Sequence, residues 1–121
     1  MTKFPTEDAE QTTLVSWFRL TYKDYIIFAI PNGGNRNPIE AKTLKQTGTL
    51  AGIPDLCILT NKGMFFVEMK KQKGGTLSKV QKEMIPRIEH LGFTVIIGYG
   101  FRDAKEKIEE YLKGIKDDRN N

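Results

Sequence analysis

The chain has 121 residues, of which 39% are hydrophobic and 28% are charged, the composition of one soluble globular domain. No apolar run approaches the roughly 18 residues needed to cross a membrane, and the N-terminal residues lack the apolar core of a secretory signal. The only cysteine, Cys57, excludes an internal disulfide, and the only histidine, His90, excludes the usual Cys/His zinc sites. These features favour a reducing, cytoplasmic setting.

The positive charge is concentrated in the middle of the chain. The formal net charge is +4, yet residues 31–82 contain nine Lys and Arg against three acids. The rest of the chain contains ten basic and twelve acidic residues, so it is slightly acidic. A basic surface of this kind favours a polyanionic partner such as nucleic acid, although a Lys-rich soluble surface would give the same charge.

The first half of the chain predicts a helix, a strand and a second helix. Residues 6–21 combine a capping residue, early acids and an apolar stripe, which favours a helix. Residues 25–30 are apolar and β-prone and predict a buried strand. Residues 31–36 are loop-like in composition. Asn37 then caps a second helix, which should end near Gly48.

The second half predicts a hairpin followed by a helix, a strand and a helix. The hairpin strands are residues 55–60 and 64–69, because Asn61-Lys62-Gly63 is a good tight-turn sequence. The later elements are a helix capped by Ser78 and ending near Leu91, a strand at 94–99, a helix at 103–113 and a frayed polar tail at 114–121.

The order α-β-α-β-β-α-β-α predicts an α/β fold with a mixed four-stranded sheet flanked by helices. The hairpin strands are antiparallel, whereas the last two strands are separated by a helix and should be parallel neighbours. There is no internal repeat and no interdomain linker, so residues 1–113 should form a single domain followed by the polar tail.

The hairpin is expected to bring three charged side chains together at its open end. A tight turn at 61–63 pairs position 55 with about position 69, which places Asp55 beside Glu68. Glu68 and Lys70 are two residues apart in one strand, so their side chains point to the same face. Two carboxylates and a lysine suit Mg²⁺ or Mn²⁺ acting on a phosphodiester, with Lys70 orienting water or neutralising charge. Each residue alone would more often be an ordinary strand-end charge.

These residues resemble the signature of a known superfamily. Pro54-Asp55 followed by Glu68-Met69-Lys70 resembles the PD-(D/E)XK nuclease motif, and the element order resembles that superfamily's restriction-endonuclease-like core. The resemblance narrows to the VRR-NUC family, stand-alone phage or bacterial type, and covers about residues 7–112. The segments that carry it are Glu10-Gln11, Ile30 to Gly34, Gly52 to Asp55, Val67 to Lys70, Leu77-Ser78 and Gln81-Lys82.

The resemblance implies a role for each matching residue. Asp55, Glu68 and the backbone carbonyl of Met69 would hold Mg²⁺ or Mn²⁺, and Lys70 would be the catalytic lysine. Glu10 would be an additional acid that reaches the metal through water, with Glu7 as its rival one turn earlier. Gln81 would be the family's active-site glutamine, although a capping box also explains it.

The resemblance further implies a metal-dependent DNA endonuclease. Branched DNA such as a four-way (Holliday) junction would be the substrate. Because symmetric cutting of two strands needs two active sites, we expect a homodimer. We expect it to act in the cytoplasm, or in the host cytoplasm if a phage encodes the chain, with no membrane partner. The alternatives are a restriction- or repair-type nuclease on linear, flap or single-stranded DNA, and a non-catalytic nucleic-acid-binding module. The expected DNA contacts are Asn32, Gly33, Gly34, Arg36, Lys71, Lys73, Lys79 and Lys82.

Overall fold

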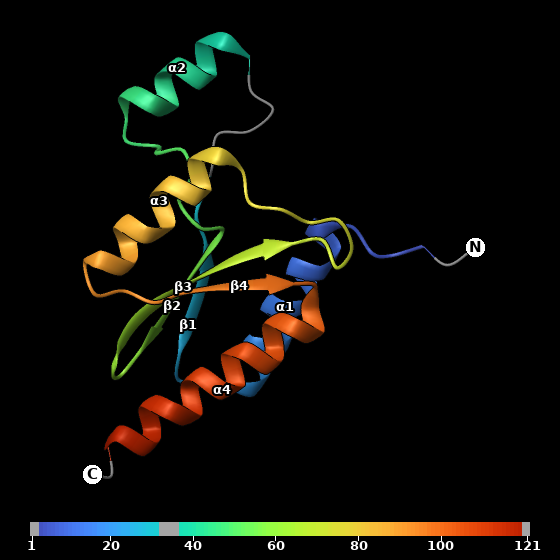
Figure 1. The fold of residues 1–121 in the computed structure, drawn as a ribbon, viewed down its shortest axis with the longest axis vertical. Coiled ribbons are helices and arrows are strands. Elements are labelled where there is room, and N and C mark those ends of the chain that lie inside the picture. The colour runs from blue at the N-terminus through green and yellow to red at the C-terminus, as the bar shows by residue number, and fades with distance from the viewer. Residues whose placement is uncertain (1–2, 32–36, 120–121) are drawn as a thin grey trace.

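The computed structural model describes residues 3–31 and 37–119, with the backbone alone described for 117–119. Eight elements follow the predicted order around a central sheet, as Figure 1 shows. They are α1 (Glu7–Thr21), β1 (Ile26–Ala29), α2 (Pro38–Gln46), β2 (Leu56–Thr60), β3 (Gly63–Lys70), α3 (Lys79–His90), β4 (Val95–Tyr99) and α4 (Phe101–Arg119).

The sheet is mixed, which confirms the predicted fold class. Its strand order is β1-β2-β3-β4; β2 runs antiparallel to both of its neighbours, and β3 and β4 are parallel. The hairpin register differs from the prediction by one residue, because Gly63 pairs with Thr60 and belongs to β3 instead of the turn. Leu56 therefore lies opposite Val67, and position 55 falls opposite 68.

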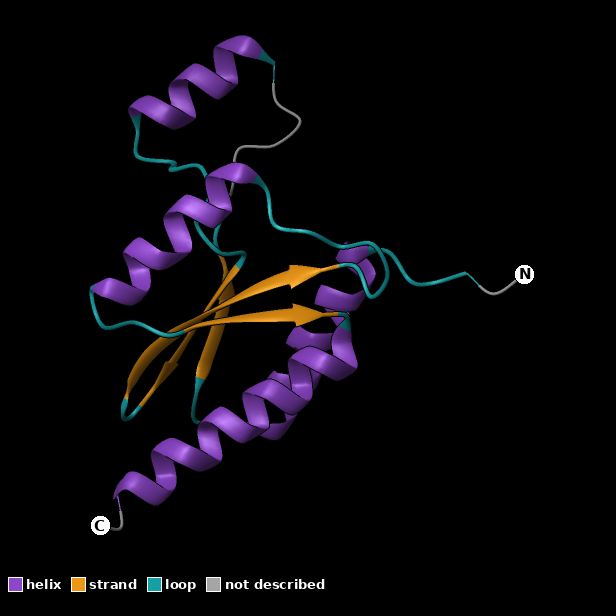
Figure 2. Cartoon of the chain, viewed as in Figure 1, coloured by secondary structure: helices purple, strands orange, loops and turns teal. Residues whose placement is uncertain are grey.

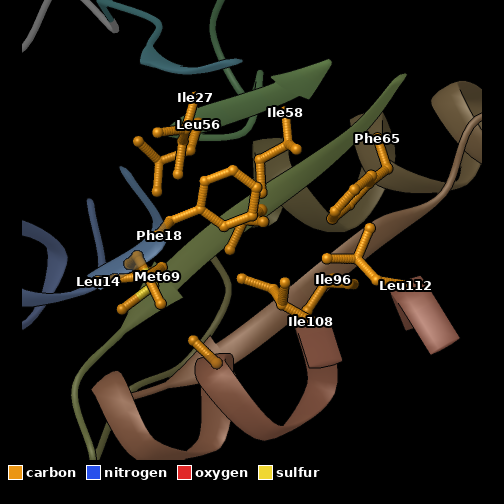
Figure 3. Close-up of a cluster of buried hydrophobic side chains, with 12 residues drawn as sticks. Leu14, Phe18, Ile27, Leu56, Ile58, Phe65, Met69, Ile96, Ile108 and Leu112 are labelled. Carbon is orange, nitrogen blue, oxygen red and sulfur yellow. The ribbon is translucent and has the colours of Figure 1, made fainter. Parts of the chain in front are cut away.

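Helices cover the two faces of the sheet unequally. In Figure 2, α1 and α4 lie on one side of the strands and α3 on the other. The core fills the first side, where apolar side chains of α1 and α4 pack against alternate strand residues, as Figure 3 shows. Met69 and Val67 of β3 belong to this core. Glu68 and Lys70 alternate with them and so face the side of α3.

The first strand is an edge strand, so the prediction of a buried strand at 25–30 is wrong. It pairs only with β2, and of its four residues only Ile27 is buried. Ile26 and Phe28 keep 57% and 41% of their surface exposed. A short apolar sequence gives no sign of whether one or two strands will flank it, because both situations favour the same β-prone residues.

The last helix is longer than predicted. It continues to Arg119, whereas the sequence pattern placed its end at Lys113 and a frayed tail beyond. Ile115 packs against the core cluster and extends the stripe that includes Tyr111 and Leu112, which gives the extra turn an apolar contact.

The helix α2 buries none of its residues and stands apart from the sheet in Figure 1. Within the described part of the chain, no helix is long and apolar enough to cross a membrane.

Candidate active site

Asp55 and Glu68 meet at the open end of the hairpin, where two hydrogen bonds join the residue before β2 to the end of β3. Asp55 immediately precedes β2, and its backbone N–H donates to Glu68 Oε1 at 3.1 Å. In return, Asp55 Oδ2 accepts a hydrogen bond from the Met69 N–H at 2.8 Å. The one-residue shift in register places the two acids directly opposite each other. Each carboxylate thus accepts one hydrogen bond from a backbone donor.

Lys70 and Gln81 complete the cluster around Glu68. Lys70 Nζ lies 3.4 Å from Glu68 Oε2, and both side chains are largely buried. Gln81 Nε2 donates to the same Oε2 at 2.7 Å. Gln81 Oε1 accepts from the Ser78 N–H at 2.9 Å, which forms the predicted capping box at the start of α3. One side chain therefore caps α3 and also donates a hydrogen bond to Glu68 of β3.

Burial raises the pKa of both carboxyl groups. Burial raises the pKa of Glu68 to about 7, the negative charge of Asp55 adds to the shift, and Lys70 opposes it. Burial likewise raises the pKa of Asp55, against the Met69 hydrogen bond and the Lys70 charge. Two neighbouring acids share one lysine, so the ionised pair carries excess negative charge. A bound cation would relieve this repulsion.

The donor set fits a hard divalent cation. Carboxylate oxygens and a backbone carbonyl are the ligands that Mg²⁺ prefers, and one or two carboxylates with water commonly suffice. The described residues include no group of three or more Asp, Glu, His or Cys side chains arranged to hold a metal. Asp55 and Glu68 are the two carboxylates of the cluster that would hold the ion. The absence of histidine and cysteine from the cluster also makes it a poor zinc site.

Glu7 and Glu10, the two α1 acids considered as candidates, occupy different surroundings. Glu7 is half-buried near the cluster, and burial raises its pKa, with Lys70 lowering and Asp55 raising it. Glu10 is 5% exposed, and its Oε1 accepts from Gln72 Nε2 at 2.9 Å and from the Phe101 N–H at 3.1 Å. Glu10 Oε2 is buried without a hydrogen-bond partner among the described residues. The charge of Asp55 and Lys70 thus acts on Glu7, whereas Glu10 is bonded elsewhere.

The expected DNA contacts divide into described and undescribed residues. Lys71, Lys73, Lys79 and Lys82 are exposed, and they lie on the segment after β3 and on the first turn of α3. Four positive charges therefore lie on two segments close to Glu68. One segment directly follows β3, the strand that carries Glu68, and the other is the start of α3, where Gln81 bonds to Glu68. Asn32, Gly33, Gly34 and Arg36 fall outside the described residues.

Two residues of this region carried no sequence signal. Gln72 was not a candidate, because a glutamine in a Lys- and Gly-rich loop has no distinguishing pattern. Gly100 has φ +89° and lies against Glu10 and Gln72, and a Gly between a strand and a helix is too common to mark such a site. Only the three-dimensional structure links these two residues to Glu10.

Comparison with solved structures shows a similarity over most of the chain. A solved structure described as a VRR_NUC domain protein superimposes on the chain with a TM-score of 0.77 and 25% sequence identity. The similarity covers 93% of this chain and 92% of the other, so it extends over most of the fold. No family model matches the sequence. No curated protein matches it either.

Proposed function

We propose that the chain is a nuclease of the VRR-NUC type, and that it is a metal-dependent DNA endonuclease selective for branched DNA. The observation that carries the proposal is the cluster of Asp55, Glu68 and Lys70 at one end of the sheet, with both acids fixed by backbone hydrogen bonds. A protein that only bound DNA would gain nothing from two acids facing the phosphates, because they repel the backbone unless a cation lies between them.

Asp55, Glu68 and the Met69 carbonyl would hold Mg²⁺ or Mn²⁺. A bound ion would supply positive charge to the phosphodiester as negative charge develops in the transition state. Lys70, held 3.4 Å from Glu68, would add a second positive charge and orient the attacking water. Gln81 donates to Glu68 and keeps its carboxylate turned towards Asp55. On α1, the charges of Asp55 and Lys70 act on Glu7.

The exposed lysines beside the cluster support a DNA substrate. Lys71, Lys73, Lys79 and Lys82 would contact phosphates and give binding a steep salt dependence through counterion release. The two described connections that adjoin the cluster, residues 47–55 and 71–78, are nine and eight residues long and offer little material for reading bases in a groove. Recognition would therefore depend on DNA shape more than on sequence.

The edge of the sheet supports a homodimer. Ile26 and Phe28 are exposed apolar residues on an edge strand, and they point away from the core on the same face as Glu68. A two-fold contact through this strand would fix two active sites at one separation and angle. Branched DNA offers two backbones in a fixed geometry, whereas a straight duplex does not.

The direct test is to incubate the purified chain with matched four-way junction, flap, duplex and single-stranded DNA in Mg²⁺, Mn²⁺ or EDTA. Paired nicks near the branch point of the junction, seen with either metal and absent in EDTA, are the expected result. Equal cleavage of linear or single-stranded DNA would contradict the branched-DNA selectivity and leave the nuclease activity standing. Full cleavage in EDTA would contradict the metal dependence.

A further inference from the structure

Glu10 holds two segments of the chain through a single oxygen atom. Its Oε1 accepts from Gln72 Nε2 at 2.9 Å and from the Phe101 N–H at 3.1 Å. Gln72 comes two residues after the end of β3, and Phe101 is the first residue of α4. Since Glu10 itself lies on α1, one buried carboxylate joins three elements that are distant in the sequence.

Both of these segments adjoin Lys70. Gly100, the residue before Phe101, donates its N–H to the Lys70 carbonyl at 2.9 Å. Gln72 follows Lys70 by two residues. The two partners of Glu10 are therefore close to Lys70 in different ways: Gln72 along the chain, and Phe101 through its neighbour Gly100. Lys70 carries the ammonium group of the proposed active site.

The packing around Glu10 has little room to rearrange. A Cβ added at Gly100 would collide with the Gln72 side chain and lie 2.8 Å from Glu10 Oε2, and the backbone φ of +89° also favours glycine. Phe101 N–H belongs to the first turn of α4, where amides have no acceptor within the helix. Glu10 supplies that acceptor, and its negative charge also suits the positive end of the helix.

We infer that Glu10 is a positioning residue: it fastens the end of β3 to α1 and to the start of α4, and so fixes Lys70 and the Met69 carbonyl in the active site. It acts through hydrogen bonds to Gln72 and Phe101 and does not serve as an acid towards the metal. This assignment rests on the proposed nuclease function. It differs from the role that the family resemblance implies for Glu10.

Glu10→Gln and Glu10→Ala separate the two roles. Glutamine keeps a side-chain carbonyl that accepts from Gln72 and Phe101, but it removes the negative charge. We expect Glu10→Gln to cleave junction DNA within about threefold of the unmodified chain, and Glu10→Ala to lose about ten- to a hundredfold in kcat with little change in KM. Both should bind Mn²⁺ in calorimetry as the unmodified chain does. If Glu10→Gln lost Mn²⁺ affinity and cleavage together, Glu10 would be a metal-linked acid and the inference would be wrong.

Amide hydrogen exchange provides a readout that does not depend on cleavage. The Phe101 amide should be protected in the unmodified chain and in Glu10→Gln, and should exchange at least about tenfold faster in Glu10→Ala. Unchanged exchange in Glu10→Ala would overturn the inference, even if the unmodified chain cut none of the DNA substrates and the proposed function failed.

Gln72→Ala covers the possibility that Glu10→Ala does not fold. Gln72 is exposed and its substitution removes one of the two donors to Glu10 without opening the core. We expect a several-fold loss of kcat with unchanged Mn²⁺ affinity. A matched control is Gln46→Ala, which removes a glutamine side chain at the end of α2, away from the sheet. Equal kcat for Gln72→Ala and the control would contradict the inference.

Discussion

The side chain of Gln81 joins the start of α3 to Glu68. Its Nε2 donates to Glu68 Oε2 at 2.7 Å, while its Oε1 accepts from the Ser78 N–H at 2.9 Å. The side-chain amide of Gln81 therefore orients both the start of α3 and the carboxylate of Glu68. A rotation of the amide would break both bonds, so the cap and the carboxylate constrain each other.

Gln81→Ala and Ser78→Ala should have similar effects on stability and different effects on cleavage. Each removes a partner of the α3 capping box, at a cost of about 1 kcal/mol. Only Gln81→Ala releases Glu68, so only this variant should lose about tenfold or more in kcat. Thermal unfolding and junction cleavage measured side by side give the comparison. If both variants lost the same activity, Gln81 would act through the helix cap alone.

Loss of either acid should abolish cleavage and leave the chain folded. Asp55→Asn and Glu68→Gln each remove one of the two charges that would hold the metal, while the side chains stay nearly the same size. Calorimetry should show Mn²⁺ binding lost in both variants, and DNA binding should be at least as tight because negative charge is removed. Glu83→Gln, which changes an exposed acid of α3, is the matched control. Metal-dependent cleavage by either site variant would refute the assignment.

The hairpin shows what the sequence could and could not predict about the site. Asp55, Glu68 and Lys70 were predicted to meet because a tight turn and strand alternation are local rules, and a one-residue error in register did not separate them. The register that puts Asp55 directly opposite Glu68 was missed, because the sequence does not show whether Gly63 belongs to the turn or to β3. Gln81 was found by its capping-box spacing and by the family resemblance, although neither predicted its bond to Glu68.

Contacts between distant segments were outside the reach of sequence patterns. Glu10 meets Gln72 and Phe101 only because α1, β3 and α4 converge at one end of the sheet, and no spacing rule relates positions 62 and 91 residues apart. The edge position of β1 was missed for a related reason. Neighbouring strands, not the residues of β1, determine whether Ile26 and Phe28 are covered. Local periodicity thus predicted the elements, and tertiary packing determined their surroundings.

Lys70→Ala should stop turnover without removing the metal. The ammonium group is not a ligand, and its loss should lower kcat by about a hundredfold, the scale for one charge-stabilising group. Lys70 also lowers the pKa of Glu68, so Mn²⁺ titration of the variant is best done well above pH 7, where Glu68 is ionised. Lys62→Ala, at the turn end of the hairpin, is the matched control. Loss of Mn²⁺ binding together with the fold would make Lys70 a structural residue.

The raised pKa of Glu68 predicts that the metal-free chain becomes less stable as pH rises. The folded-state pKa is about 7, above the ordinary value of 4.5, so the folded chain binds the extra proton. The part of the folding free energy that comes from this proton is fully present below about pH 4.5 and is lost as pH rises through about 7. Unfolding temperatures should therefore fall across this range without metal, and Mn²⁺ should raise them at about pH 8 but not at about pH 5.

Glu68→Gln is the control for this pH dependence. It removes the titrating group, so its unfolding temperature should show a weaker decline between about pH 5 and 8 and no rise with Mn²⁺. The same decline in the variant would assign the effect to other groups, of which Asp55 is the first candidate because burial also raises its pKa.

Substitution of the exposed edge strand should separate the dimer from the active site. We expect sedimentation to show a dimer, and Phe28→Lys or Ile26→Lys to give a monomer, since a lysine on an edge strand opposes association. Each monomer would retain Asp55, Glu68 and Lys70, so Mn²⁺ binding should persist. Junction cleavage should change from paired cuts to single nicks, because the second site is no longer held at the opposite strand.

The control is Leu91→Lys, which changes an exposed apolar residue beyond α3. This variant should remain a dimer and make paired cuts. A monomeric unmodified chain that still makes paired cuts would show that the two sites need no fixed spacing, and it would remove the geometric reason for preferring branched DNA.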